Sequence, residues 1–265
     1  MTAASAVATG LFTSAAAGIL ASLHLAPFGE LRRLFFALNA GIALLFLCLA
    51  LPFQGSPAAA GPTAVLIASA AAAALVIAYV AALYLPRAGS GKPLLGLAAA
   101  AALAATGLDG WGAAGRGSRG WLFGANALAA AALLGSVIVA MILGHWYLVR
   151  SRLSAGHLVR FARLVAGAIG VRAVLLGAGL LIYGAGSPLG PGGVLRDVAV
   201  ERGFFFWQRV GFGLIGPAVL AYMIHETARI RSTQSATGIL YLAVIFVLIG
   251  EFLARYLTVA GAGPI

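Results

Sequence analysis

Long apolar runs follow one another along this chain, and they restrict its fold more than any other feature. A run of about 20 apolar residues is long enough to cross the hydrocarbon core of a membrane as a helix, and eight such runs are present. They are continuous and do not alternate with polar residues, which excludes a transmembrane β-barrel. With 62% hydrophobic and 9% charged residues among 265, a water-soluble fold could not bury the apolar surface. The sequence therefore predicts an all-α integral membrane protein, a bundle of about eight transmembrane helices.

The predicted spans are joined mostly by short connections. They cover residues 3–25, 34–53, 63–86, 93–109, 121–149, 157–183, 203–227 and 234–259. The span 93–109 is the weakest, because it is short, rich in alanine and ends at Asp109. The connection 184–202 is rich in glycine and contains two prolines, so we expect it to be a loop. No connection is long enough for a soluble domain, so residues 1–265 are expected to form a single polytopic domain.

Basic residues are distributed unevenly between the two sets of connections, and cytoplasmic loops carry the excess of Lys and Arg. The larger set comprises Arg32, Arg33, Arg87, Lys92, Arg150, Arg152, Arg160, Arg163, Arg229 and Arg231. The smaller set, mixed with Asp109, Asp197 and Glu201, comprises Arg116, Arg119, Arg196 and Arg202. We therefore expect the larger set to face the cytoplasm and both termini to lie outside. The net charge of +11 then reflects topology and not nucleic-acid binding.

Ionisable side chains inside spans are energetically costly, which makes them candidates for function. On this topology, one polar group lies at a common depth in the outer half: Asn126, Arg172, Arg209, Glu251 and Arg255. Glu251 and Arg255 are one helical turn apart and share a face. Three arginines near one glutamate leave an excess of positive charge, which favours a bound anion, a polar headgroup or a ligand carbonyl. A salt-bridge network that holds the helices together is the alternative.

The histidines form a second group, on the inner side. His24, His145 and His225 end three predicted spans, and His157 begins another. They are either interfacial residues beside basic loops, members of a proton relay, or ligands of a b-type haem. Imidazole is a common axial ligand of haem, and two of His24, His145 and His225 would be needed. Cys48 is the single cysteine, so no iron–sulfur cluster or covalently attached haem is expected in this chain, and no metal site is predicted.

Several stretches resemble the DmsC type of membrane anchor, which is related in architecture to the NrfD and polysulfide-reductase anchors. GEFLARY (250–256) resembles the G-E-[LF]-x-[GA]-R pattern of the last helix in that family. FFFWQRV (204–210) resembles the start of its penultimate helix, and residues 121–144 resemble its fifth helix. ASLHLAPFGELRRLF (21–35) resembles the H-L-G-x-P-x-R-A stretch, whose histidine is implicated in quinol binding. The resemblance lies mainly within residues 121–260.

The resemblance implies a membrane anchor of a respiratory molybdopterin and iron–sulfur oxidoreductase, in the cytoplasmic membrane of a prokaryote. Such a subunit has no redox centre of its own, binds menaquinol or ubiquinol near the outer leaflet, and exchanges electrons with an iron–sulfur partner beside the catalytic subunit. Glu251 would accept protons, and arginines would stabilise negative charge on a quinone oxygen. The expected quinone-binding residues are Arg209, Arg255, Arg172, Asn126, Trp207 and His24.

Three other functions stay open at this point. A b-type cytochrome subunit would use the histidines as haem ligands. A transporter would have broken helices at the membrane midplane and often internal repeats, whereas these charges lie off the midplane and no repeat is evident. A structural assembly subunit would suit the spans 63–86 and 93–109, which are rich in alanine and glycine.

Overall fold

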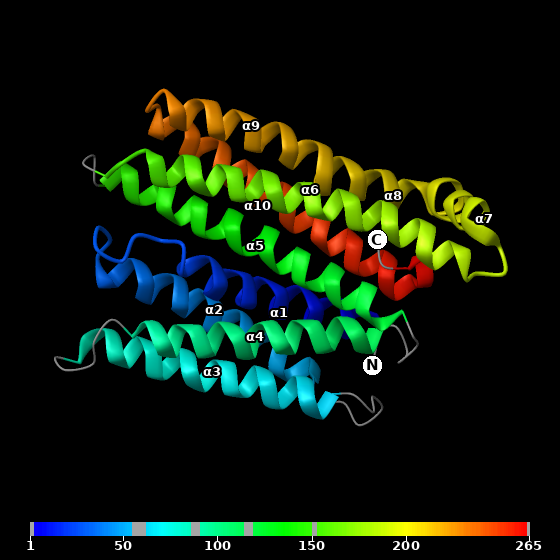
Figure 1. Ribbon diagram of the computed structural model, residues 1–265, viewed down its shortest axis with the longest axis horizontal. Helices are drawn as coiled ribbons and strands as arrows, with labels where there is room; N and C mark the ends of the chain where they lie inside the picture. The colour runs from blue at the N-terminus through cyan, green and yellow to red at the C-terminus, as the bar shows by residue number, and fades with distance from the viewer. Residues whose placement is uncertain (1–2, 55–61, 86–90, 114–118, 150–152, 264–265) are drawn as a thin grey trace.

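The protein forms a bundle of long helices that run side by side (Figure 1). The computed structural model describes residues 3–54, 62–85, 91–113, 119–149 and 153–263, and these ranges contain no strand. Eight helices within them are long and apolar enough to cross a membrane. The predicted fold class, an all-α membrane bundle, is confirmed.

The helix bounds stay close to the predicted spans. The first six helices are α1 (Ala3–Leu23), α2 (Arg33–Gln54), α3 (Pro62–Tyr84), α4 (Lys92–Ala113), α5 (Gly120–Val149) and α6 (Gly156–Ala185). The rest of the chain forms α7 (Gly190–Arg196), η1 (Asp197–Glu201), α8 (Gly203–Val210), η2 (Gly211–Ile215), α9 (Gly216–Arg229), α10 (Thr233–Leu257) and η3 (Thr258–Ala262). The segments α8, η2 and α9 together make the seventh crossing. Helix α4 continues one turn beyond the predicted end, so Asp109 lies inside a helix.

Helices α1 and α5 occupy the centre of the bundle. Helix α1 contacts α2, α4, α5 and α10, and α5 also contacts α4, α6 and α10. Helices α2, α3 and α4 therefore flank one side, and α6, α9 and α10 flank the other (Figure 1). The two central helices touch through their backbones, because a Cβ atom on Gly18 or on Gly135 would collide with backbone atoms of the other helix. Small residues at such crossings let membrane helices pack closely without a hydrophobic driving force.

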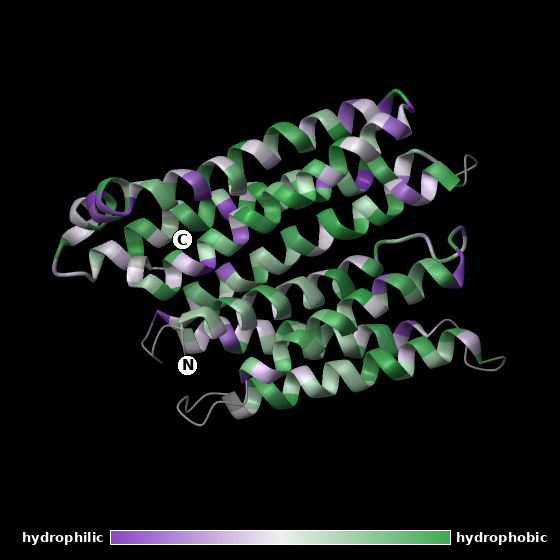
Figure 2. Cartoon of the chain, turned by 180° about the vertical axis from the view of Figure 1, so that it is seen from behind, coloured by the Kyte–Doolittle hydropathy of each residue, from purple (hydrophilic) through white to green (hydrophobic). Residues whose placement is uncertain are grey.

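Both ends of the described chain lie at the same end of the bundle, which we call the terminal end (Figure 1). The other is the opposite end. Apolar residues dominate the length of the helices, and hydrophilic residues gather at both ends, with a few inside the bundle (Figure 2). Seven of the basic residues used to orient the chain lie at or near the opposite end: Arg32, Arg33, Lys92, Arg160, Arg163, Arg229 and Arg231. Arg87, Arg116, Arg150 and Arg152 lie outside the described residues.

The prediction of a loop at 184–202 is wrong, because residues 190–201 are helical. Pro191 sits in the first turn of α7, where a missing backbone N–H is tolerated, so proline starts this helix and does not prevent it. Val194 and Val198 are four residues apart and share a buried face. They pack with Phe206 of α8 and Leu257 of α10. These four side chains form what we call the apolar cap.

Candidate functional site

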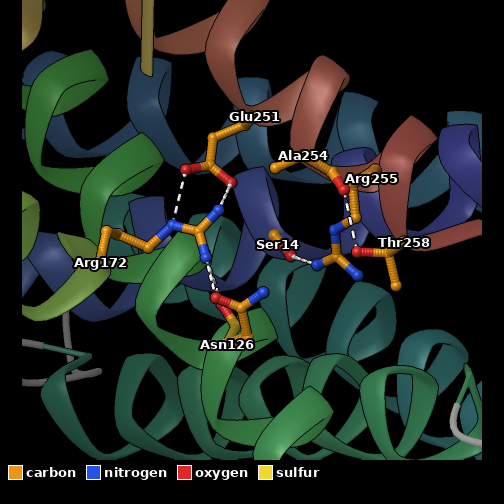
Figure 3. Close-up of polar contacts among 7 residues, drawn as sticks. All are labelled: Ser14, Asn126, Arg172, Glu251, Ala254, Arg255 and Thr258. Atoms are coloured by element: carbon orange, nitrogen blue, oxygen red, sulfur yellow. Dashed lines mark hydrogen bonds and ion pairs between the residues drawn. The ribbon is translucent and has the colours of Figure 1, made fainter. Parts of the chain in front are cut away.

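A buried ion pair joins two of the predicted site residues. Arg172 of α6 donates from Nε to Glu251 Oε1 at 2.8 Å and from a terminal nitrogen to Oε2 at 2.7 Å (Figure 3). Its third nitrogen donates to the side-chain oxygen of Asn126 on α5. Arg172 and Glu251 are each 1% exposed. The fork of one guanidinium thus fixes α5, α6 and α10 to one another, and both charged groups are satisfied.

Arg255 faces a different set of partners, although it is one turn from Glu251 on the same helix. Its guanidinium donates to the hydroxyl of Ser14 on α1 at 2.6 Å (Figure 3). The carboxylate of Asp109 on α4 lies 3.8 Å from it. Asp109 was missed as a site residue because the fourth span was expected to end there. The signal in the sequence was an acid beside an apolar alanine-rich run, and the extra turn of α4 brings it into the bundle.

Arg209 of α8 differs from Arg172 and Arg255, because its guanidinium has no hydrogen-bond partner among the described residues. Its side chain is 0% exposed. Across the described ranges, none of its three guanidinium nitrogens has a hydrogen-bond partner. The guanidinium lies over Gly213, where a Cβ atom would collide with it, and Gly213 in turn touches Gly250 of α10. Arg209 therefore lies against α10 at the residue that precedes Glu251.

A π-helical turn shapes this contact. Residues Gly211–Ile215 form η2, and π-turns inside helices occur frequently at functional sites. Pro217 follows in the first turn of α9. Gly213 of η2 provides the space for the arginine and for close approach of α10. The irregular turn thus lies just before the proline.

The charges of this site do not balance. We call Asp109, Arg172, Arg209, Glu251 and Arg255 the buried arginine cluster. Its three guanidinium groups face two carboxylates, and the hydrogen bonds leave the surplus positive charge on Arg209. An unpaired charge or an unmade hydrogen bond is costly in an apolar interior. The cluster can therefore donate hydrogen bonds to one more oxygen atom, through the N–H groups of Arg209.

The space next to the cluster is small in this conformation. A cavity of about 20 Å³ lies among Asn126, Arg172, Arg255 and the backbone of α4 at Gly110. This volume is enough for one water molecule. The apolar cap lies nearer the terminal end than the cluster, since Leu257 follows Glu251 on α10 and Phe206 precedes Arg209 on α8. Arg209 does not line this cavity and is fully buried, so a ligand would reach it only by displacing side chains.

Two predicted site residues are not brought into this cluster. Trp207 is 61% exposed and its ring nitrogen donates to the backbone oxygen of Ala199 in η1 at 3.1 Å. His24 follows the end of α1, at the opposite end of the bundle. The structure thus gathers Asn126, Arg172 and Glu251 directly, places Arg209 beside them, and joins Arg255 to Asp109.

The histidines share one end of the bundle but contact different elements. His24 bonds a backbone oxygen of its own helix at 3.2 Å, and His145 lies 3.2 Å from the hydroxyl of Tyr241. His225 has a buried Nδ1 that makes no hydrogen bond within the described ranges. The described residues contain no group of three or more His, Cys, Asp or Glu side chains that could hold a metal ion.

The function has to be argued from these contacts. No known family model matches the chain, and no curated protein matches it at a significant level.

Proposed function

We propose that the chain is a membrane subunit of an electron-transfer complex and binds a quinone or quinol at the buried arginine cluster. The observation that supports this most is Arg209, a buried cation without a hydrogen-bond partner within the described residues. A quinone suits it because the molecule dissolves in the membrane interior and carries carbonyl oxygens that accept hydrogen bonds. The guanidinium would hold one carbonyl and stabilise negative charge that develops on it during reduction.

The neighbouring groups have defined roles in this proposal. Oxidation of a quinol releases two electrons and two protons. Glu251, the carboxylate beside Arg209, would accept the two protons one after the other and release each to water at the terminal end before it takes the next. Its bond to Arg172 has to loosen for this step, and Asn126 keeps Arg172 in place when it does. The electrons pass to an iron–sulfur centre of a partner subunit, because this chain has a single cysteine and holds no cluster of its own.

The direction of the bundle in the membrane follows from its charges. The opposite end carries the larger basic set and faces the cytoplasm of a prokaryotic cell. The terminal end then lies outside, with both termini, and the iron–sulfur subunit and the catalytic subunit bind there. The cluster supports this arrangement because it lies in the half of the bundle nearer the terminal end.

Substitution of Arg209 by methionine tests the proposal through two readouts that should move in opposite directions. Quinone binding is expected to weaken by about 10- to 150-fold, which corresponds to the loss of one hydrogen bond from a charged donor. The free energy of unfolding is expected to rise by about 1–3 kcal/mol, because an unsatisfied buried donor is removed. Binding of a short-chain quinone to the purified chain is measured by equilibrium dialysis, and stability by thermal unfolding in detergent.

Arg160→Gln is the matched control, since Arg160 is exposed near the opposite end and should change neither readout. Equal quinone affinity in Arg209→Met and the unsubstituted chain would contradict the proposal. The absence of saturable quinone binding to the unsubstituted chain would also contradict it.

A further inference from the structure

A second polar site lies at the opposite end, far from the buried arginine cluster. A cavity of about 750 Å³ opens between the end of α5, the start of α6 and the turn that joins α9 to α10. Three arginines line it, namely Arg163, Arg229 and Arg231, and none of its lining residues is acidic. We call this cavity the basic pocket.

Two of these arginines have no acidic partner among the described residues. Arg229 pairs with Glu226 at 3.0 Å. Arg163 and Arg231 form no salt bridge with any described residue. They come from different elements, α6 and the α9–α10 turn, and converge on the same cavity. Guanidinium groups that converge from two sides provide the geometry that recognises phosphate oxygens.

The backbone around the basic pocket adds to its positive character. Gly156 begins α6 and Thr233 begins α10, and both residues line the cavity. The N-cap residues Ala155 and Ser232 form no side-chain cap, and at the start of α6 the Gly156 N–H donates to the hydroxyl of Ser154 at 3.3 Å. The N-terminal end of a helix carries a partial positive charge and favours an anion nearby. The N-terminal ends of α6 and α10 and the three arginines therefore all favour an anion in the basic pocket.

The conformation of Arg231 also indicates a role for its side chain. Its φ angle is 62°, in the left-handed region that glycine and asparagine adopt more readily than arginine. A glycine would form the same turn at lower conformational cost. The turn therefore carries an arginine at a position where the backbone alone favours another residue.

Part of the remaining wall of the basic pocket is apolar. Leu148, Leu153 and Val159 line it beside the arginines. The pocket lies at the ends of the transmembrane helices, at the level where lipid headgroups meet water. We infer that the basic pocket binds the phosphate headgroup of an anionic phospholipid, with its acyl chains along the apolar wall. Anionic lipids are enriched on the cytoplasmic side, where the basic set of this chain is expected to lie.

The inference does not depend on quinone binding, and lipid binding to the purified chain tests it. Native mass spectrometry measures short-chain phosphatidylglycerol against phosphatidylcholine, for the unsubstituted chain and for the double variant Arg163→Gln, Arg231→Gly. The dissociation constant for phosphatidylglycerol is expected to rise about 30-fold in the variant, since each of the two basic residues near a lipid surface contributes about fivefold. Phosphatidylcholine is expected to bind weakly to both.

The double variant Arg32→Gln, Arg33→Gln is the matched control. Both arginines are exposed near the same end and do not line the pocket. Equal loss of affinity in the control would overturn the inference, because the effect would then be one of net charge. Equal binding of the two lipids would overturn it as well. Inorganic phosphate is tested as a competitor, and binding of phosphate alone as tight as that of phosphatidylglycerol would overturn the assignment to a lipid.

Discussion

Replacement of Glu251 by glutamine is expected to lower the free energy of unfolding by about 3–5 kcal/mol, the usual cost of removing one partner from a buried ion pair. The side chain keeps its size, so the packing of α10 is preserved and the loss comes from charge. Arg172 then has no carboxylate within hydrogen-bonding distance, and Arg209 loses the nearest negative group. The measurement is unfolding of the purified chain in mixed micelles, followed by circular dichroism.

A double variant separates the interaction from the two side chains. Arg172→Met with Glu251→Leu removes both charges and keeps most of the volume, and such replacements of buried pairs are often close to neutral. The double variant is therefore expected to be more stable than either single variant. If the effects of the two single substitutions simply add, the pair does not hold the bundle together in the way its geometry indicates.

Replacement of Gly135 by alanine is expected to cost about 3 kcal/mol, at the upper end of the range for overpacked cores. The added methyl group would meet the backbone of α1 at Gly18, and a helix backbone cannot rotate out of the way as a side chain can. Helices α1 and α5 must then separate, which loosens the contacts that both make with α4 and α10. Thermal unfolding in detergent is the measurement.

The same substitution at Gly170 on α6 is the control for the change in helix propensity. A Cβ atom there meets nothing within 4 Å. Gly170→Ala is expected to raise stability by up to about 1 kcal/mol, because alanine favours a helix more than glycine does. A loss of stability at both positions would show that the crossing of α1 and α5 is not the reason.

Much of the fold could be predicted from the sequence because the length of an apolar run sets the length of a membrane helix. The common depth of Arg172, Arg209 and Glu251 could be predicted in the same way, by counting residues along spans whose direction alternates. The residue that each buried charged side chain binds could not be predicted from the sequence. Glu251 and Arg255 share one face of α10, yet they bind residues on different helices, Arg172 of α6 and Ser14 of α1.

Asp109 and residues 190–201 also show that tertiary contacts could not be predicted from the sequence. Asp109 became a partner of Arg255 only because α4 extends past it, and helix ends are set by tertiary contacts as much as by composition. The helical segment at 190–201 lies in the connection 184–202, for which the sequence predicts a loop because glycine and proline are typical of turns. Val194 and Val198 stabilise it by burial against α8 and α10, which the local composition does not reveal.

The position of Glu251 on α10 has a consequence for biosynthesis. A chain is made from its N-terminus, so α6 enters the membrane with Arg172 and α8 follows with Arg209 before α10 exists. Each arginine near the centre of a span costs about 2.5–3.5 kcal/mol on insertion scales. Before α10 is inserted, the guanidinium groups of Arg172 and Arg209 lie in an incomplete bundle. This bundle lacks Glu251, the carboxylate that later pairs with Arg172. Insertion of α10 therefore supplies the carboxylate that pairs with Arg172, and a chain that stops before residue 233 lacks it.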